Sequence, residues 1–484
     1  MGPNRSSKTE DREPSLRQPD HRGTLVLSDE SGYVGDTITF HGRNFPTDEQ
    51  FDIEWRTVEG SWGVLEAHEI VGPQFRPRTE TIATVTTDAD GRFDHEWTIP
   101  EDYGSFHTVS VTTKDGTTVD QAEFEISPWF ELDRKSAELG DFVVVTGYGL
   151  GPGVMVNNYQ VAWDNTTVGF LTGVRNRGTA TAEIRAVGPP GEHILQVWRG
   201  YRGMPFLQNN TQSPYGKVAN GRQTAWTVDV TEPETDPQTA WVDPMPEERP
   251  LSTHYPELDE ASEAELSISP EYGQSGTEAI ITGEQFQPHT EVDLIWYHHS
   301  GHEPQGPDKP PLPTITAEPW PETLPTVETD ADGRFQVDVT IPKDIGSTRP
   351  ITARVGGRDV AVTGFMMQPS IETFSPTSGP VGTEIEIELT GVGWTQYEMS
   401  PLFVYDNGPL GYACGLSDKE DGTTIRTILQ ASGQPGWHFI DAYPTLFRMQ
   451  EEEPEFELNA HLSYLDNHPM RPVPAFHFAF EITE

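Results

Sequence analysis

The chain has 484 residues, with 31 Lys and Arg against 77 Asp and Glu, and a formal net charge of −46. This charge repels phosphate groups, so it excludes sequence-independent nucleic-acid binding and disfavours binding to anionic membranes. No stretch approaches the ~18 consecutive apolar residues that a membrane-spanning helix requires. At about 150 residues per domain, the length predicts three or four domains.

Lysine is scarce, because only seven of the basic residues are Lys and the other 24 are Arg. A surface dense in carboxylates and poor in Lys stays solvated where concentrated salt screens the repulsion between charges. The composition therefore indicates a protein of a halophile, with an ordinary acidic protein at lower salt as the alternative. Residues 1–22 are polar and lack the apolar segment of a signal peptide, so we expect a disordered N-terminal tail there.

A short segment containing a glycine occurs four times along the chain. Three copies are clear and one is fainter; in chain order they are residues 31–42, 137–147, 272–283 and 378–387. The equivalent glycines are separated by 105, 136 and 106 residues, and they are Gly35, Gly140, Gly276 and Gly382. Four copies predict four domains, with about 30 additional residues between the second and the third.

The four repeats fall into two types. The first and third share Thr-Asp-Ala-Asp-Gly-Arg-Phe, at residues 87–93 and 329–335. The second and fourth share an Asp-Asn pair and a Gly-x-Pro-Gly-x-His segment, the latter at residues 188–193 and 433–438. The offset stays between 241 and 245 residues, so the chain is one two-domain unit that has been duplicated.

The local pattern within each repeat has a period of two. In the third repeat, for example, Phe335, Val337, Val339 and Ile341 alternate with polar residues. Such alternation, bounded by Gly, Pro, Asp and Asn, is typical of half-buried strands. About seven short strands in about 100 residues predict a β-sandwich.

The repeats resemble a known family. Ser-Pro-Thr-Ser-Gly-Pro-Val-Gly-Thr at residues 375–383, followed by Thr-Gly-Val-Gly-Trp at 390–394, is similar to the opening of an immunoglobulin-like IPT/TIG domain, and residues 269–286 resemble it too. The resemblance implies tandem surface-exposed adhesion, spacer or accessory modules, and by itself it implies no chemistry. We therefore expect an all-β protein of four tandem Ig-like β-sandwiches, arranged as a duplicated two-domain unit.

The predicted Ig-like domains span residues 23–127, 128–231, 263–367 and 368–484. Between the second and third lies an acidic, Pro-rich linker at residues 232–262, with six Pro and nine Asp or Glu. Proline and like charges keep such a segment extended and solvated, so we expect the two halves to separate after cleavage of the linker.

The repeated Thr-Asp-Ala-Asp-Gly segment offers clustered carboxylates, which are the ligands that Ca²⁺ prefers. The candidate ligands are Asp88, Asp90, Asp330 and Asp332. An EF-hand loop would need a Glu where the sequence has Ile99 and Ile341. We favour the alternative, a β-hairpin turn with a glycine at positive φ, and we expect no cofactor.

A second candidate metal site is the segment that contains His298, His299 and His302, because zinc uses histidine ligands. The equivalent residues of the first repeat, 56–62, contain no His, and no distant Cys or His pattern completes a site. We therefore expect no zinc.

Motifs for catalysis are absent from the sequence: it has no nucleophile elbow, phosphate-binding loop or dinucleotide fingerprint. The single cysteine, Cys414, corresponds to Thr172 of the second repeat, which indicates a small buried side chain rather than a nucleophile. Paired carboxylates are inevitable among so many acidic residues and do not indicate a glycosidase. We expect no enzymatic activity.

Two long arms, residues 199–223 and 444–474, precede the last strands of the second and fourth domains. Aromatic and Arg side chains are enriched there, as at protein contact surfaces. The candidate interaction residues are Trp198, Arg199, Tyr201, Arg202, Phe206, Tyr443 and Phe447. The aromatic rings could also stack on sugars, and a further alternative is that each arm folds back on its own sandwich.

These patterns favour a structural or attachment protein exposed on the surface of an assembly, above all a virion component of a halophilic virus. The alternative is a cell-envelope or secreted adhesin, or a carbohydrate-binding protein, of a halophile. Expected partners are subunits of the same assembly or a host surface glycan or protein, without nucleic acid or membrane insertion. The expected location is extracellular or on a virion surface, by a route without a signal peptide or after its removal.

Lowering the salt concentration should destabilise the fold, because weaker screening increases the repulsion among the 77 acidic residues. We expect the thermal unfolding midpoint, followed by circular dichroism, to rise steadily from dilute buffer to molar KCl. A midpoint that stays constant over this range would contradict the halophile interpretation.

Overall fold

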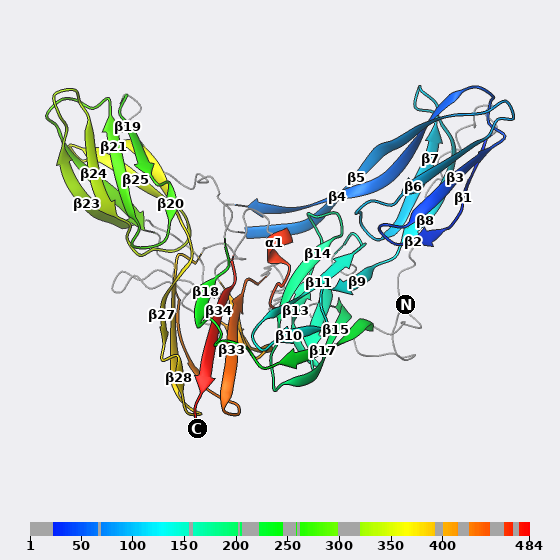
Figure 1. The fold of residues 1–484 in the computed structure, drawn as a ribbon. Helices are drawn as coiled ribbons and strands as arrows, with labels where there is room; N and C mark the ends of the chain where they lie inside the picture. The colour runs from blue at the N-terminus through cyan, green and yellow to red at the C-terminus, as the bar shows by residue number, and fades with distance from the viewer. Residues whose placement is uncertain are drawn as a thin grey trace, which may run out of the picture. The chain divides into compact units, whose positions relative to one another are not determined.

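The computed structural model describes residues 23–65, 69–153, 158–201, 204–205, 222–244, 258, 262–298, 320–392, 400–414, 425–445, 459–467 and 474–484. These residues form four tandem Ig-like β-sandwiches in a duplicated two-domain arrangement, which confirms the predicted fold class (Figure 1). The first sandwich makes one compact unit of Met1–Val58, Pro77–Pro100 and Ser105–Ser127, and the remaining residues make a second unit. The predicted tail at residues 1–22 lies outside the described residues.

The first and third sandwiches share one strand order. In the first, a three-stranded sheet runs β1 (Thr24–Leu27), β3 (Thr37–Arg43), β6 (Phe93–Thr98). Its five-stranded sheet runs β2 (Ser31–Gly32), β8 (Thr118–Ile126), β7 (Ser105–Thr112), β4 (Gln50–Leu65), β5 (Glu69–Thr86). In the third, the sheets run β19 (Glu265–Ser269), β21 (Glu278–Glu284), β24 (Phe335–Thr340), and β20 (Tyr272–Gly273), β26 (Arg358–Met367), β25 (Ser347–Val355), β22 (Glu291–His298), β23 (Trp320–Glu328).

The second sandwich pairs a small sheet with a larger one. The small sheet runs β14 (Ala180–Arg185), β11 (Phe142–Tyr148), β9 (Trp129–Leu132). The large sheet runs β10 (Ser136–Glu138), β17 (Arg222–Thr231), β15 (Gly191–Tyr201), β12 (Tyr159–Trp163), β13 (Thr166–Leu171), with β16 (Met204–Pro205) beside β15.

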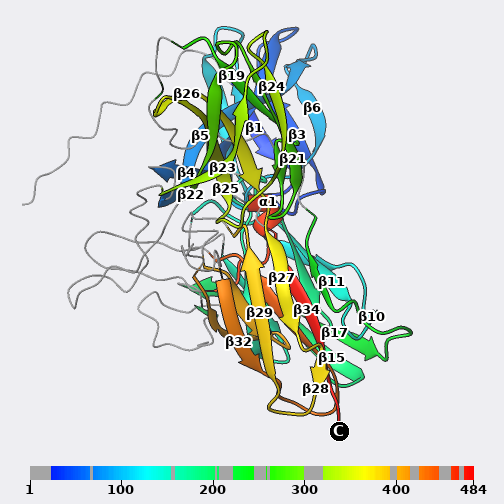
Figure 2. The same cartoon turned by 90° about the vertical axis from the view of Figure 1, so that its left-hand side faces the viewer.

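The fourth sandwich repeats that plan, and its small sheet of β27 (Ser370–Ser375), β29 (Glu384–Thr390) and β32 (Ile425–Gln430) is seen in Figure 2. Its large sheet runs β18 (Ala240–Val242), β34 (Phe476–Ile482), β33 (Gly436–Tyr443), β30 (Leu402–Tyr405), β31 (Gly408–Tyr412), with β28 (Ser378–Gly379) beside β34. Strand β18 comes from the predicted linker, so the linker is not wholly extended and solvated as expected, because the β18 backbone completes this sheet.

The fourfold glycine repeat has one structural explanation. In every sandwich a very short strand pairs in parallel with the strand of the large sheet that comes last in the chain, and the chain then turns into the middle strand of the small sheet. The turn places the repeated glycine at a φ of 79° to 94°, which side chains disfavour. The turn-forming glycines are those singled out in the sequence: Gly35, Gly140, Gly276 and Gly382.

The features shared by the second and fourth repeats also pack together. Asp164 and Asp406 lie at positive φ in hairpin turns, and each accepts a 2.6 Å hydrogen bond from the histidine of the Gly-x-Pro-Gly-x-His segment, His193 or His438. The other ring nitrogen of each histidine lies 2.8 Å from a carbonyl oxygen of that segment. These contacts tie two loops together at the end of each sandwich.

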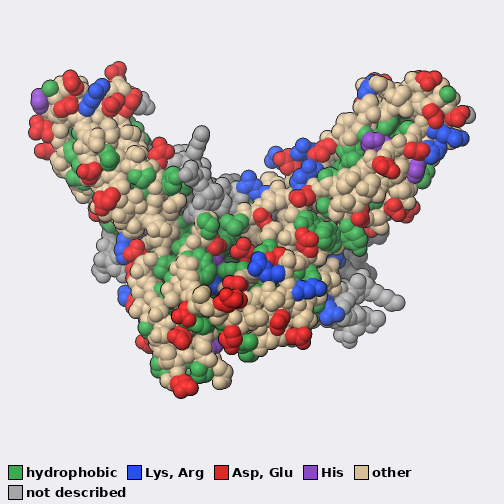
Figure 3. Space-filling model, in the orientation of Figure 1, with side chains coloured by type: hydrophobic (Ala, Val, Ile, Leu, Met, Phe, Trp, Pro, Cys, Tyr) green, Lys and Arg blue, Asp and Glu red, His purple; other side chains and the backbone are tan. Residues whose placement is uncertain are grey.

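Large aromatic residues are buried in the cores of the first and third sandwiches. Trp55 and Trp296 are 1% and 0% exposed, at the centres of the first and third sandwiches. Acidic side chains are spread over the visible surface rather than gathered in one patch (Figure 3). The helix in the described part of the chain, α1 (Tyr464–Asn467), has four residues and is too short to cross a membrane.

Candidate functional site

The large sheet of the fourth sandwich is buried on both of its faces. On β33 and β34, Ile440, Ala442 and Phe478 point into the core of their own sandwich. Phe439 and Ala479, on the opposite face, join the core of the second sandwich instead. Sheets covered on both faces have nearly continuous apolar strands, and the Phe-His-Phe-Ala-Phe sequence of β34 follows that rule.

The second sandwich supplies the surface that covers this outer face. A Cβ atom at Gly140 would lie 2.6 Å from the Phe439 ring, so only glycine lets the ring approach the backbone this closely. The Arg185 guanidinium, at the end of β14, lies over the rings of Phe142, Trp241 and Phe439 at 4.4, 4.8 and 5.1 Å. The cation is therefore enclosed by aromatic side chains from both sandwiches and from β18.

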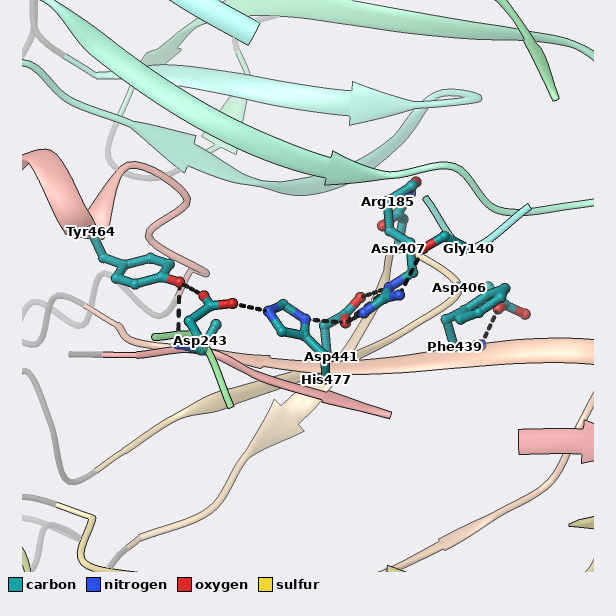
Figure 4. A network of polar contacts seen from close by, with 10 residues as sticks. Gly140, Arg185, Asp243, Asp406, Asn407, Phe439, Asp441, Tyr464 and His477 are labelled. Atoms are coloured by element: carbon teal, nitrogen blue, oxygen red, sulfur yellow. Dashed lines mark hydrogen bonds and ion pairs between the residues drawn. The ribbon is translucent and has the colours of Figure 1, made fainter. Parts of the chain in front are cut away.

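A row of polar side chains crosses this contact (Figure 4). Arg185 donates to Asp441 through Nε at 3.0 Å and through Nη2 at 2.6 Å, and its Nη1 donates to the Gly140 carbonyl at 2.9 Å. His477 lies between Asp441, at 2.7 Å, and Asp243, at 2.9 Å. Tyr464 of α1 donates its hydroxyl proton to Asp243.

The charges of this cluster compensate one another. Burial alone would raise the pKa of Asp441, but the charge of Arg185 and the hydrogen bond from His477 hold that pKa below its ordinary value. Burial opposes the charged form of His477, yet its hydrogen bonds to Asp243 and Asp441 raise its pKa. Two cations therefore face two anions, and with the side chains of Arg185 and Asp441 each 1% exposed, a dissolved ligand has no access to their charges.

The charged pair is not repeated at the equivalent positions of the duplicated unit, which the described strands include. The strand registers place Gln430 where the second sandwich has Arg185, and Gln196 where the fourth has Asp441. The small sheet of one sandwich thus recognises the large sheet of the other, and the reverse pairing would lack the ion pair.

A second contact joins the same two sandwiches through residues 459–467. The backbone of Phe170 bonds to Ala460 and Leu462 at 2.8 and 2.7 Å, and the Phe170 ring stacks on His461. Burial lowers the pKa of His461 to about 3, so its ring is neutral at ordinary pH. The Ser463 hydroxyl accepts from the Thr172 N–H and donates to the Thr172 carbonyl, at 2.9 and 3.0 Å, which is a bridging role rather than that of a nucleophile.

The predicted interaction residues differ in how far their side chains are buried. Tyr443 is 2% exposed within the contact between the second and fourth sandwiches, so its ring cannot stack on a sugar. Trp198 is half-buried and donates to Gln196, whereas Arg199 is exposed on β15. The other candidates lie outside the described residues or have side chains that are not described: Tyr201, Arg202, Phe206 and Phe447.

The candidate calcium ligands lie in turns. One oxygen of Asp88 accepts the backbone N–H groups of Asp90 and Arg92, and Asp330 does the same for Asp332 and Arg334. These bonds close the hairpin turns that we favour over a calcium loop. Within the described ranges, no three metal-binding side chains converge.

Of the three candidate zinc ligands, the described residues include His298 alone. His298 is buried, stacks on Trp320 at 3.7 Å, and lies 2.6 Å from Glu322. His299 and His302 lie outside the described residues. Cys414 is half-buried, with its Sγ 3.7 Å from the Ser400 hydroxyl.

The sequence did not predict the Arg185 cluster. Its members come from β14, β33, β34, α1 and the segment after β18, and no local pattern joins them. One signal was present: β34 and the end of β33 break the apolar-polar alternation of half-buried strands, which indicates a sheet covered on both faces.

Comparisons with known proteins do not assign the chain to a family. No protein-family model matches it, and no curated protein does. Its structure is similar, at a TM-score of 0.18 and 10% identity, to Escherichia coli α2-macroglobulin, with 96% of this chain and 42% of that chain covered. The ICAM-5 D1-D4 ectodomain fragment gives a TM-score of 0.16 at 10% identity, covering 89% and 96%. A putative membrane anchored protein from Corynebacterium diphtheriae gives 0.18 at 9%, covering 71% and 91%.

The chain thus spans less than half the length of the α2-macroglobulin chain that it matches. At these TM-scores the neighbours indicate nothing about what this chain binds or does.

Cutting the linker should leave the two halves associated, contrary to the expectation from the sequence, because the second and fourth sandwiches share a buried contact. A protease site inserted after Pro250 allows cleavage, and gel filtration in molar KCl should show both fragments eluting together. Arg185→Met should weaken this association by about 3–5 kcal/mol, because it leaves buried carboxylates without their main partner. Arg134→Met, which removes an exposed pair with Asp133, is the control. Separation of the cleaved wild-type halves would contradict the contact.

Raising the pH should weaken the same contact. The folded pKa of His477 lies above its ordinary value of about 6.5, so its stabilisation is complete below that value and is lost as the pH rises through the folded pKa. We expect the unfolding midpoint in molar KCl to fall between about pH 6 and about pH 9, and to fall less in His477→Gln. Some slope should remain, because hydrogen bonds to carboxylates also raise the pKa of His298 and His438 despite burial.

The matched control for this pH series is His289→Gln, since the His289 side chain is 67% exposed. It should keep the wild-type slope. Equal slopes in the wild type and in His477→Gln would show that His477 is not protonated in the folded state.

Proposed function

We propose that the chain is a non-enzymatic structural or attachment subunit on the surface of a larger assembly, and that this assembly is a virion of a halophilic virus. The observation that supports this role most is the buried contact between the second and fourth sandwiches. It joins two sandwiches that lie apart in the sequence into a packed unit held by Arg185, Asp441 and one shared core. A packed unit of this kind keeps the distance between its two sandwiches fixed under mechanical force. A structural subunit of an assembly needs this property.

The sandwiches themselves are proposed to be of the IPT/TIG type. The Ser-Pro-x-x-Gly openings of the third and fourth sandwiches carry this assignment, and the parallel pairing of their first short strands fits it. Modules of this type serve as spacers and adhesion domains, and function on them resides in surface sites rather than in the fold.

The partners and location follow from the same proposal. The chain would contact subunits of its own assembly or a host surface protein, outside the cell or on the virion surface. A cell-envelope adhesin is the alternative location for the same architecture. The carbohydrate-binding version has less support, because Tyr443, one of its proposed stacking rings, is buried inside the chain.

Fractionation of the source culture tests the proposal. Antibodies against the folded chain should follow purified particles through a density gradient in molar salt and should label those particles without lysis. A nucleic-acid-bound protein from inside the same particles is the control for integrity. Recovery of the chain with the cell envelope would favour the adhesin, and recovery only in the cell interior would overturn both.

A further inference from the structure

An open groove of about 520 Å³, lined by both apolar and acidic side chains, lies at one edge of the first sandwich. Strand β1 lines one side, and β2, β8 and the start of β7 line the other. Phe106 is 67% exposed and Val26 is 51% exposed, so the groove presents large apolar side chains to solvent. All of its residues belong to the first compact unit, so its geometry depends on that unit alone.

The groove is flanked by two strand edges that are only partly paired in the described sheets. In the described sheets β1 pairs with β3 on one side, and β8 pairs with β7 on one side and with β2 only at Glu125 and Ile126. The Leu25 N–H on the β1 edge bonds to the Asp120 carboxylate rather than to another strand, at 2.7 Å. Extended peptides bind such edges through their backbone, with side-chain pockets giving specificity.

The third sandwich shows that the fold does not require this groove. The registers place Tyr272 where the first sandwich has Ser31, Met366 where it has Glu125, and Thr348 where it has Phe106. Met366 and Thr348 are 2% and 1% exposed, so in the third sandwich this edge is closed. Of these two equivalent edges, the one in the first sandwich carries an exposed aromatic ring and the one in the third does not.

The charge around the groove identifies the kind of occupant. Three glutamates, Glu30, Glu123 and Glu125, line it, and no Lys or Arg is among its lining residues. A second copy of the chain, with its charge of −46, is repelled from this surface. A cationic segment is attracted to the glutamates, while its apolar side chains can cover Phe106 and Val26.

We infer that this groove binds an extended segment of another protein in which Arg or Lys alternates with apolar side chains. The segment pairs with a free strand edge, places its apolar side chains against Phe106 and Val26, and directs its cations to the three glutamates. The inference rests on the proposed role as an assembly subunit, and it names the chemistry of the partner.

A labelled peptide tests the inference on the full chain. The probe is a fluorescein-labelled decapeptide of alternating Arg and Val, and its Glu-Val counterpart is the charge control. Fluorescence anisotropy at low and at molar KCl should show saturable binding of the Arg-Val peptide. Its affinity should exceed that of the Glu-Val peptide by about tenfold or more at low salt.

Two variants locate the binding. Phe106→Thr, which copies the third sandwich, should lower the affinity about tenfold, and Ser31→Tyr with Glu125→Met should lower it similarly by filling the groove. Ile428→Thr is the matched control, because Ile428 is 59% exposed on the fourth sandwich, and it should bind as the wild type does. All variants should keep the wild-type circular dichroism spectrum and unfolding midpoint.

Unchanged binding in Phe106→Thr, or equal affinity for both peptides, would overturn the inference. A concentration-dependent dimer that Phe106→Thr abolishes would also overturn it, by making a second copy the occupant. A failure of the peptide experiment leaves the particle fractionation unaffected, and a failure of the fractionation leaves the peptide result standing, so the two proposals fail separately.

Discussion

The ion pair between Arg185 and Asp441 is the constraint around which the second compact unit is organised. Both side chains are 1% exposed, and removing two charges from water costs several kcal/mol per ion unless each finds full compensation. Here the compensation comes from His477, from the Gly140 carbonyl and from three aromatic rings. A displaced register would leave a buried charge unpaired, so the pair selects one arrangement of the two sandwiches more than it adds net stability.

Duplication followed by divergence explains why the small sheet of the second sandwich packs on the large sheet of the fourth, and not the reverse. Two identical units could have paired in two equivalent ways, with the small sheet of either one on the large sheet of the other. Gln430 and Gln196, at the positions equivalent to Arg185 and Asp441, remove the ion pair from one of them. The first and third sandwiches have diverged as well, since an open edge at Phe106 corresponds to a closed one at Thr348. In both cases a few side chains distinguish copies that share one backbone plan.

Most of the fold could be predicted from the sequence, because its determinants are local. The glycines at positive φ, the period-two strands and the Asp-Asn turns each specify their own conformation within a few residues. The contact between the sandwiches could not be predicted, because Asp243, Asp441 and His477 lie far apart in the chain and meet only after three strands have paired. For the same reason the sequence predicts a free linker, although β18 within it completes a sheet. The composition of the linker predicts how well it is solvated, but the position of β18 depends on its pairing with β34.

Salt divides the interactions of this chain into two groups. Attraction between exposed charges is screened within a few ångströms at molar ionic strength, whereas a pair buried from solvent is screened much less. In brine, the 77 acidic residues therefore keep the surface hydrated without steering partners over a distance. Contacts that must persist there depend on excluded water, on apolar area and on backbone pairing. Inside the chain, the Arg185 cluster is shielded from water. At the surface, the groove beside Phe106 offers apolar area and backbone pairing. In concentrated salt these apolar and backbone contacts would provide most of the affinity for a partner, and the glutamates would mainly provide selectivity.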